Sequence, residues 1–257
     1  GRMGLLFPAV ALMAVFLVGP IAYSVYGSLT NAALSGYKAA NPEFVGLENY
    51  VELLTSNAFW KAVLLTVIFV FASAVVGQNI LGLALAMLMR KAPKVLSTLV
   101  GGVVVIAWVM PEIVAAFALY AFFSTDGTLN VLLSYIGLGG TTWLLTFPMF
   151  SVIMANIWRG TAFSMMVYSA ALAEVPPEIQ EAAKVDGARG WQRFFFVTLP
   201  MIKGSISTNL LLTTLQTLGV FTLLWVMTGG GPGTQSTTLP VMAYQEAFKN
   251  SLIGYRT

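Results

Sequence analysis

The sequence contains no cysteine and no histidine among its 257 residues. Without a thiolate or an imidazole, the chain lacks the usual ligands of zinc, copper, haem and iron–sulfur clusters, and it has no Ser/His or Cys/His nucleophile pair. We therefore expect no catalytic residue, no metal site and no cofactor on this chain.

Charge is also scarce: 9% of the residues are charged, 58% are hydrophobic and the mean hydropathy is +0.82. These values lie far from those of a water-soluble domain. The net charge of +3 is small and the basic residues form short clusters beside apolar runs, which argues against nucleic acid as a partner. The composition predicts a polytopic membrane protein surrounded by lipid.

Several apolar windows are long enough to cross about 30 Å of hydrocarbon, which takes roughly 20 residues in a helix. They are Leu5–Leu29, Ala62–Met89, Leu96–Phe123, Met149–Ala173 and Ile206–Met227. The first window follows Arg2 and is too long for the apolar region of a signal peptide. We expect it to be a retained span.

The distribution of Lys and Arg between the short loops predicts the orientation. If the spans alternate, one side holds Arg2, Arg90, Lys91, Lys94, Lys184, Arg189, Arg193 and Lys203, and the other holds Lys38, Lys61, Lys249 and Arg256. This bias predicts a multi-pass protein of the cell inner (plasma) membrane with a cytoplasmic N-terminus. The expected extracytoplasmic loops are 30–61, 124–148 and 229–250.

Segment 174–203 is the most charged stretch inside the chain. Two prolines end the fourth span, since proline lacks an amide donor yet suits the first turn of a new helix. We expect a short helix at Pro177–Val185, a turn at Gly187 and a second helix over 188–200. These parts form a helix–turn–helix elbow in the cytoplasm.

The charges of the elbow balance one another, so it is not a simple anchor for anionic lipid. The acids are Glu174, Glu178, Glu181 and Asp186, and the bases are Lys184, Arg189, Arg193 and Lys203. Ala182 and Ala183 leave room for close approach by another protein. The elbow suits docking, although a solvated loop that serves only the orientation bias accounts for the same residues.

Three motifs in order carry a resemblance to a known family. The first is EAA at Glu181–Ala183, followed by Gly187 and then by LP at Leu199–Pro200; the others are FVGLENY at 44–50 and GGGPGTQSTTLPVMAYQEAF at 229–248. Together they resemble the membrane subunits of binding-protein-dependent ABC importers. The motif EAAKVDGA is similar to the carbohydrate branch of the family, the maltose and glycerol-phosphate type. Within that branch the chain resembles the first permease of the pair, and a trehalose importer is one candidate.

The resemblance implies an all-α, polytopic membrane helical bundle of the type I ABC importer permease kind, as one domain over residues 1–257. It implies that the elbow inserts into a cytoplasmic ATPase through Glu181, Ala182, Ala183, Asp186, Gly187 and Arg189. The implied partners are a second permease subunit, two ABC ATPase subunits that hold ATP and Mg, an extracytoplasmic solute-binding protein and a sugar substrate.

The sequence departs from the family in two places. The family has six spans, whereas five are visible, so we expect a closing span to be missing and the C-terminus to lie outside. Lys203 and Gly204 stand where the family usually has a proline after the LP pair. This change affects how the fifth span begins.

Alternative functions remain at this stage. One is an ABC importer permease for another solute, such as glycerol phosphate, a polyamine or an amino acid. Another is a membrane enzyme acting on lipid-linked sugar, which would need paired acids with metal or base support. A channel-like or scaffolding subunit would leave the EAA elbow unexplained.

Ionisable and polar residues within the spans are candidates for a substrate pathway. Glu112 and Arg159 each lie roughly 15 Å from the outer end of their span, at 1.5 Å per residue, so they could pair. Such a pair is either structural or part of a gate or substrate contact. Asn209, Thr213 and Gln216 share one helical face, which either lines the pathway or joins helices. Asn156 is a weaker candidate.

Other features have simpler interpretations. Gly77 and Gly82 indicate close helix packing, and the tryptophans in the spans either stack on sugar rings or pack. The glycine run at 229–233 lacks the Gly-Lys-Ser/Thr ending of a phosphate loop, so we expect an outer loop that either touches a solute-binding protein or is a plain turn.

Overall fold

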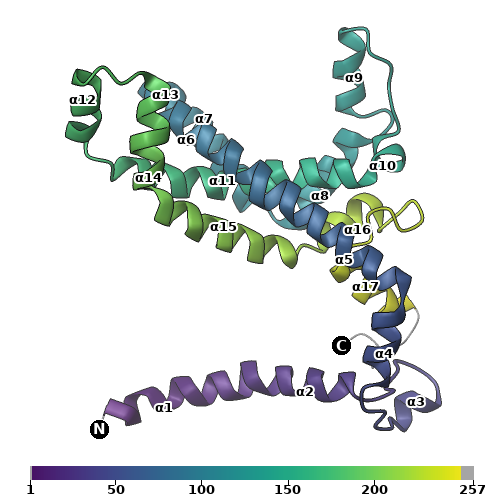
Figure 1. The fold of residues 1–257 in the computed structure, drawn as a ribbon. Helices are drawn as coiled ribbons and strands as arrows, with labels where there is room; N and C mark the ends of the chain where they lie inside the picture. The colour runs from purple at the N-terminus through teal and green to yellow at the C-terminus, as the bar shows by residue number, and fades with distance from the viewer. Residues whose placement is uncertain (1, 250–257) are drawn as a thin grey trace. The chain divides into compact units, whose positions relative to one another are not determined.

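The computed structural model describes residues 2–249, and within that range every extended regular element is a helix. One isolated antiparallel bridge joins Thr30 and Phe44. The predicted all-α class is therefore confirmed (Figure 1). The chain divides into two compact units, residues 1–64 with 239–257 and residues 65–238, and each is described by itself. A single domain over residues 1–257 stays a prediction.

The first unit begins with one continuous helical rod. Its helices are α1 (Arg2–Met13), the π-helix η1 (Ala14–Val18), α2 (Gly19–Ser28), α3 (Tyr37–Ala40), α4 (Glu48–Thr55), the start of α5 (Asn57–Val70), α17 (Leu239–Tyr244) and the π-helix η4 (Gln245–Lys249). The stretch Val10–Ser28 is long and apolar enough to cross a membrane, and none of that window is buried. This helix agrees with the predicted first span.

The FVGLENY motif closes the end of α2. The side-chain amide of Asn49 donates to the carbonyls of Ser28 at 2.9 Å and Thr30 at 2.8 Å, and the hydroxyls of Tyr50 and Ser28 lie 2.6 Å apart. Ser28 is the last residue of α2 and Thr30 lies two residues beyond it, so neither carbonyl has a partner within the helix and these bonds satisfy both. The motif therefore has a structural role at this turn.

The second unit contains the remaining helices. They are the end of α5, the π-helix η2 (Phe71–Gln78), α6 (Asn79–Lys91), α7 (Lys94–Val109), α8 (Glu112–Phe123), α9 (Thr128–Tyr135), α10 (Trp143–Thr146), α11 (Pro148–Ala173), α12 (Pro177–Val185), α13 (Gly190–Arg193), the π-helix η3 (Phe194–Thr198), α14 (Leu199–Met201), α15 (Lys203–Leu218) and α16 (Thr222–Thr228). Helix α11 covers the predicted fourth span, Met149–Ala173, although it is not one of the stretches that qualify as membrane spans by hydropathy.

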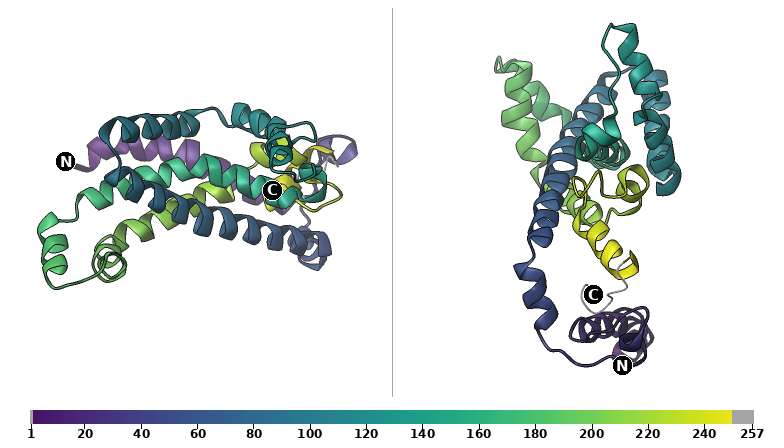
Figure 2. Two further views of the ribbon diagram at one scale, coloured as in Figure 1. Left: turned by 90° about the horizontal axis from the view of Figure 1, so that it is seen from above. Right: turned by 90° about the vertical axis from the view of Figure 1, so that its right-hand side faces the viewer.

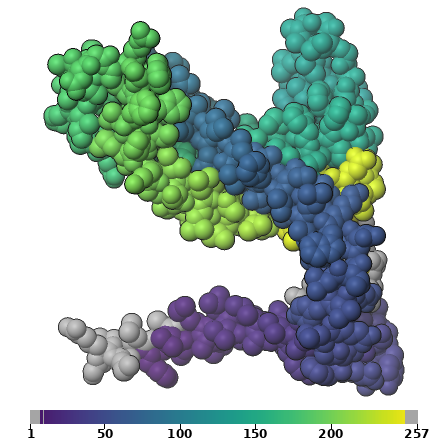
Figure 3. Space-filling model, in the orientation of Figure 1, coloured from purple at the N-terminus to yellow at the C-terminus, as the bar shows by residue number. Residues whose placement is uncertain are grey.

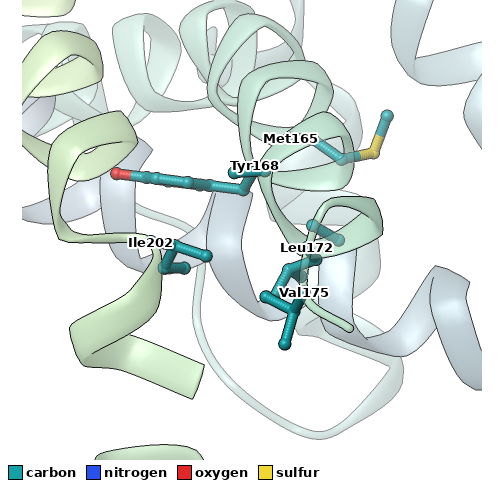
Figure 4. Packing of buried hydrophobic residues seen from close by; sticks show 7 residues of the cluster. Met165, Tyr168, Leu172, Val175 and Ile202 are labelled. Carbon is teal, nitrogen blue, oxygen red and sulfur yellow. The ribbon is translucent and has the colours of Figure 1, made fainter. Parts of the chain in front are cut away.

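The π-helix η2 and helix α6 pack closely on α11 because Gly77 of η2 and Gly82 of α6 face side chains of α11. A Cβ on Gly77 would lie 2.3 Å from Ile157, and one on Gly82 would lie 2.4 Å from Ser164. The predicted packing role of both glycines is confirmed. Next to this contact, the buried side chains of Met165, Tyr168, Leu172, Val175 and Ile202 form an apolar cluster with Ala86 and Ala171 (Figure 4).

The predicted third span is wrong as a single helix. Helix α7 ends at Val109, and α8 begins at Glu112. Met110 has an extended ψ of 133°, which the following Pro111 favours because its ring disfavours helix in the preceding residue. The apolar window is therefore two helices joined at a proline.

The predicted fifth span, Ile206–Met227, is also two helices. Helix α15 ends at Leu218 and α16 starts at Thr222, with Gly219 at the C-terminal cap. At its other end, α15 is bent by 69° from the helix over Gly190–Met201. The bend lies where the sequence has Lys203 and Gly204 in place of the usual proline.

By length and composition, three described helical stretches qualify as membrane spans. They are Val10–Ser28, Asn57–Lys91 and Glu112–Tyr135. The bent pair Gly190–Met201 and Lys203–Leu218 makes a fourth if it counts as one span. The second of these stretches is longer than the predicted Ala62–Met89 at both ends.

Candidate functional site

The elbow has the predicted geometry. Helix α12 covers Pro177–Val185, and Gly187 follows it with a φ of +81°, a conformation that residues with a Cβ rarely adopt. The N–H groups of Gly187 and Ala188 donate to the carbonyls of Lys184 at 3.1 Å and Ala183 at 3.0 Å. These two bonds close the end of α12 as in a Schellman motif.

The second limb of the elbow starts at Gly190 and not at Ala188 as predicted. The backbone N–H of Arg189 donates to the side-chain oxygen of Gln192 at 2.7 Å, which caps the limb. Helix α13, η3 and α14 then continue to Met201. The side-chain amide of Gln180 donates to Thr198 Oγ1 at 2.8 Å and ties the two limbs together.

The outer surface of the elbow carries the predicted coupling residues. Glu181, Ala182, Asp186, Gly187 and Arg189 are exposed, and Ala183 is half-buried. None of their side chains forms an ion pair within residues 2–249. Figure 3 shows this part, in green, as a projecting surface at one end of the second unit.

One apolar residue lies among these charges. Val185, the last residue of α12, is 86% exposed. The surface therefore combines an accessible apolar side chain, small residues and charges of both signs, which are the groups that a docking contact uses.

Glu112 and Arg159 form the predicted pair. Arg159 Nη1 lies 3.7 Å from Glu112 Oε2, and the two side chains are 25% and 29% exposed. Glu112 Oε1 also accepts a hydrogen bond of 3.1 Å from the backbone N–H of Leu223 in the first turn of α16. Glu112 is the first residue of α8, so this carboxylate joins α8, α11 and α16 where two predicted spans are broken.

Asn209 and Thr213 lie inside the second unit. The Asn209 amide donates to Asn79 Oδ1 at 2.8 Å and to Ser164 Oγ at 2.9 Å. Thr213 Oγ1 donates to the Asn209 carbonyl at 2.8 Å and lies 3.5 Å from the amide of Asn79. Asn79 also accepts a hydrogen bond from the Tyr168 hydroxyl. These contacts join α6, α11 and α15, which agrees with the interpretation that the polar face of α15 holds helices together.

Asn156 belongs to the same buried layer. Its side-chain amide donates to Ser73 Oγ at 2.8 Å and to Thr217 Oγ1 at 3.4 Å. Its backbone carbonyl accepts a hydrogen bond of 3.0 Å from the Gln78 side chain. Gly160 makes room for this contact, since a Cβ there would lie 2.2 Å from the Gln78 side chain. Asn156 therefore has partners on both neighbouring helices.

Gln216 differs from Asn209 and Thr213 in burial. Gln216 is exposed, whereas Thr217 is buried beside the other two. In projection along α15, Gln216 lies near Asn209, but it is at the exposed edge of the predicted face. The buried side of α15 follows the four-residue steps from Asn209 to Thr213 and Thr217.

Sequence reasoning missed Ser164, Tyr168 and Thr217 as members of this polar layer. A signal was present: Asn156, Gly160, Ser164 and Tyr168 recur every four residues along α11, as polar or small residues do on one helix face. Read together with Asn79 and Asn209, that spacing predicts a polar seam between helices.

The glycine run folds into a loop that bonds to itself. Gly229, Gly230 and Gly233 have positive φ values of 61°, 90° and 62°. Thr237 Oγ1 donates to the Gly230 carbonyl at 2.9 Å, and Ser236 Oγ lies 2.8 Å from Thr228 Oγ1. These bonds support the interpretation of a compact turn, while its contact with a solute-binding protein stays a prediction.

Within residues 2–249 no group of three or more acids gathers as metal ligands do. The predicted Lys249 lies in η4, and Arg256 lies outside the described residues. The described side chains of the site form hydrogen bonds and the Glu112–Arg159 ion pair.

Comparison with known proteins identifies a family. Residues 78–253 match the family described as binding-protein-dependent transport system inner membrane component. The chain is 32% identical over 243 residues to the trehalose/maltose transport system permease protein MalF of Thermococcus litoralis, covering 93% of this chain and 81% of that protein. It is 33% identical over 259 residues to the sulfoquinovosyl glycerol transport system permease protein SmoG of Agrobacterium fabrum, covering 98% and 81%.

A solved structure has the same fold. A chain of a bacterial ABC transporter involved in the import of the acidic polysaccharide alginate superposes with a TM-score of 0.81. The two chains are 24% identical, and the superposition covers 99% of this chain and 86% of that one. The chain therefore has the fold of that transporter chain.

Proposed function

Because the chain belongs to the family of binding-protein-dependent transport system inner membrane components, we propose that it is the membrane-spanning subunit of an ATP-driven sugar importer. Two similar proteins are named as permeases for trehalose/maltose and for sulfoquinovosyl glycerol. The buried amides and hydroxyls of the second unit bond to one another and join helices, so it is charge that bears on the solute. Because Arg159 is paired with Glu112, a neutral sugar fits the interior of this unit better than an anion, and a disaccharide is the expected substrate.

The observation that carries the proposal is the exposed elbow. Its first limb presents Glu181 beside Ala182, and the turn after that limb has Gly187 at a positive φ. In the proposed complex, the elbow inserts into a cleft of an ATPase subunit that holds ATP and Mg. Charge-assisted hydrogen bonds to Glu181 would fix its register.

The proposed mechanism is alternating access. ATP binding closes a pair of ATPase subunits, the elbow follows as a rigid body, and the attached helices α11 and α15 reopen the pathway to the outside. A second permease subunit supplies the other half of the pathway, where the exposed Gln216 faces it. A solute-binding protein delivers the sugar at the extracytoplasmic loops, and the N-terminus lies in the cytoplasm.

Two variants of the elbow test the coupling role. Glu181→Lys reverses the charge at the docking surface, and Gly187→Pro removes the positive φ because proline is confined near −65°. We expect sugar uptake to fall by about two orders of magnitude if a buried charge contact of about 3 kcal/mol is lost. ATP hydrolysis by the complex should persist without uptake.

The matched control is Glu178→Lys, an equal charge reversal one turn earlier on the same helix. It should insert and transport like the parent chain, since Glu178 is not among the proposed docking residues. Normal uptake by both Glu181→Lys and Gly187→Pro would refute the docking role. Membrane insertion is checked by the amount of each variant in isolated membranes.

A further inference from the structure

A groove of about 620 Å³ lies between the end of α6 and the two limbs of the elbow. Its walls include Met87, Arg90, Lys91, Glu181, Trp191 and Arg193. Figure 2 shows that α6 ends and α7 begins at the same end of the second unit as the elbow. The groove therefore opens where a membrane span stops and the proposed cytoplasmic loop starts.

The groove gathers positive charge although the elbow as a whole is balanced. Arg90, Lys91 and Arg193 face one acid, Glu181. None of the three cations forms an ion pair within the described part of the chain. The Nε atom of Arg193 is buried and has no hydrogen-bond partner. The buried Nε–H of Arg193 thus lacks an acceptor. The oxygens of a phosphate group can accept from two N–H groups of one guanidinium at once.

The same groove has apolar walls. Met87, Leu172, Phe194 and Phe195 contribute to its lining. Trp191 at its rim is 56% exposed and lies 6.2 Å, between ring centroids, from Phe196, which is 71% exposed. Exposed aromatic rings of this kind are enriched where a membrane meets water. The groove thus offers cations and an apolar wall to one ligand.

We propose that this groove binds an anionic glycerophospholipid, with the headgroup phosphate on Arg193, Arg90 and Lys91. The acyl chains would run along the exposed apolar side of α6 past Met87. A basic pocket beside the cytoplasmic end of a membrane helix is a recurring arrangement for such headgroups. The bound lipid joins α6 to the elbow, an assignment beyond the proposed transport function.

The charge complementarity favours lipid over a protein partner in this groove. A protein surface would have to desolvate three unpaired cations and supply several acids with matching geometry. A lipid reaches the groove by lateral diffusion in the membrane, its phosphate contacts the cations, and its acyl chains cover the apolar wall. The proposed ATPase contact uses the outer surface of the elbow, at Glu181, Asp186 and Gly187, and Glu181 lies where that surface meets the groove wall.

The test measures retained lipid on the assembled transporter. The complex is placed in nanodiscs of phosphatidylcholine with a minor share of phosphatidylglycerol, extracted, and analysed by native mass spectrometry. The parent complex should retain phosphatidylglycerol in preference to phosphatidylcholine. Arg193→Gln and the double variant R90Q/K91Q should lower the retained phosphatidylglycerol by about fivefold for each cation removed.

Matched controls separate this site from general surface charge. The double variant K184Q/K203Q removes two exposed cations of segment 174–203 that neither line the groove nor belong to the proposed docking residues, and it should retain lipid like the parent. Arg193→Lys keeps the charge but loses the fork of donors, so an intermediate retention is expected. Gel filtration of each complex checks that the subunits stay assembled.

Three results would overturn the proposal. One is equal retention of phosphatidylglycerol by the groove variants and the controls. A second is displacement of the lipid by millimolar inorganic phosphate, which would indicate a site for free anion. A third is a photo-crosslinker at Trp191 that captures an ATPase subunit and no lipid.

Discussion

At the residue scale, the sequence predicts which polar side chains matter better than it predicts where they face. The Glu112 and Arg159 pair follows from the cost of ionisable groups in a membrane, and it is present. At about 100° per residue, Thr213 lies about 40° to one side of Asn209, whereas Gln216 lies about 20° to the other. The buried face of α15 is centred towards Thr213 and Thr217, a fact set by α6 and α11 and not by α15 alone.

Asn209 and Gln216 should respond oppositely to substitution. Asn209→Ala removes two hydrogen bonds between helices and should lower the free energy of unfolding by about 1–3 kcal/mol. Gln216→Ala removes an exposed side chain on the same helix, so it should leave stability within about 0.5 kcal/mol and reduce uptake if Gln216 lines the pathway.

The readouts are the thermal midpoint of purified protein in detergent and the initial rate of sugar uptake. Equal destabilisation by both variants would contradict the assignment of buried and exposed faces. An unchanged uptake with Gln216→Ala would remove this residue from the pathway while leaving the role of Asn209 standing.

At the element scale, composition predicts helices but not their breaks. The elbow is predictable because Pro177 and Gly187 are local signals with few alternatives. The break between α7 and α8 has such a signal in Pro111, yet an apolar window of this length hides it. The break before α16 has Gly219 at the cap of α15 and a hydrogen bond from the Leu223 N–H to Glu112 of α8, and only the first of these is readable from the local sequence.

The ion pair should couple α8 to α11. Glu112→Gln keeps an acceptor for the Leu223 N–H but leaves the part-buried Arg159 without its counter-charge. We expect Glu112→Gln alone to destabilise the protein, and the further change Arg159→Gln to recover part of the loss. The coupling energy between the two changes should be about 0.5–3 kcal/mol.

Thermal unfolding of the two single variants, the double variant and the parent completes this cycle. Additive effects within error would mean that the 3.7 Å contact contributes nothing to the joining of the helices. Because a Gln at 112 keeps the hydrogen bond, the comparison isolates charge from hydrogen bonding.

Close packing of α6 on α11 leads to a second prediction at this scale. Gly82→Ala would place a Cβ 2.4 Å from the Ser164 Cβ and 2.9 Å from backbone atoms of α11, so the helices must separate. The expected loss is about 1–3 kcal/mol, as for other overpacked contacts. The measurement is the fraction of detergent-solubilised protein that survives heating.

Gly102→Ala is the matched control, because Gly102 is also helical and its Cβ would meet nothing within 4 Å. It should be neutral or stabilise by about 0.5–1 kcal/mol, since alanine favours the helix. Similar losses from both substitutions would show that helix propensity, and not the contact with Ser164, determines the role of Gly82.

At the scale of the whole molecule, the polar character of the interior limits the solute. Within residues 65–238 the buried polar side chains are amides and hydroxyls, and Arg159 has Glu112 beside it. An anionic solute would need cations that are not already paired. The relatives are named for trehalose/maltose and for sulfoquinovosyl glycerol, a sugar with an anionic sulfonate, so members of this family carry sugars of different charge.

Uptake of labelled solutes by cells with and without this chain tests that limit. We expect loss of the chain to abolish uptake of a neutral disaccharide, with trehalose and maltose as the first to assay, and re-expression to restore it. Glycerol phosphate uptake should not change, because its phosphate finds no unpaired cation in the polar layer. Cells that express the Glu181→Lys variant should hold the protein in the membrane yet import no disaccharide, which ties uptake to the elbow. Uptake of glycerol phosphate that depends on this chain would contradict the solute class, and it would leave the elbow prediction to be judged by the variant alone.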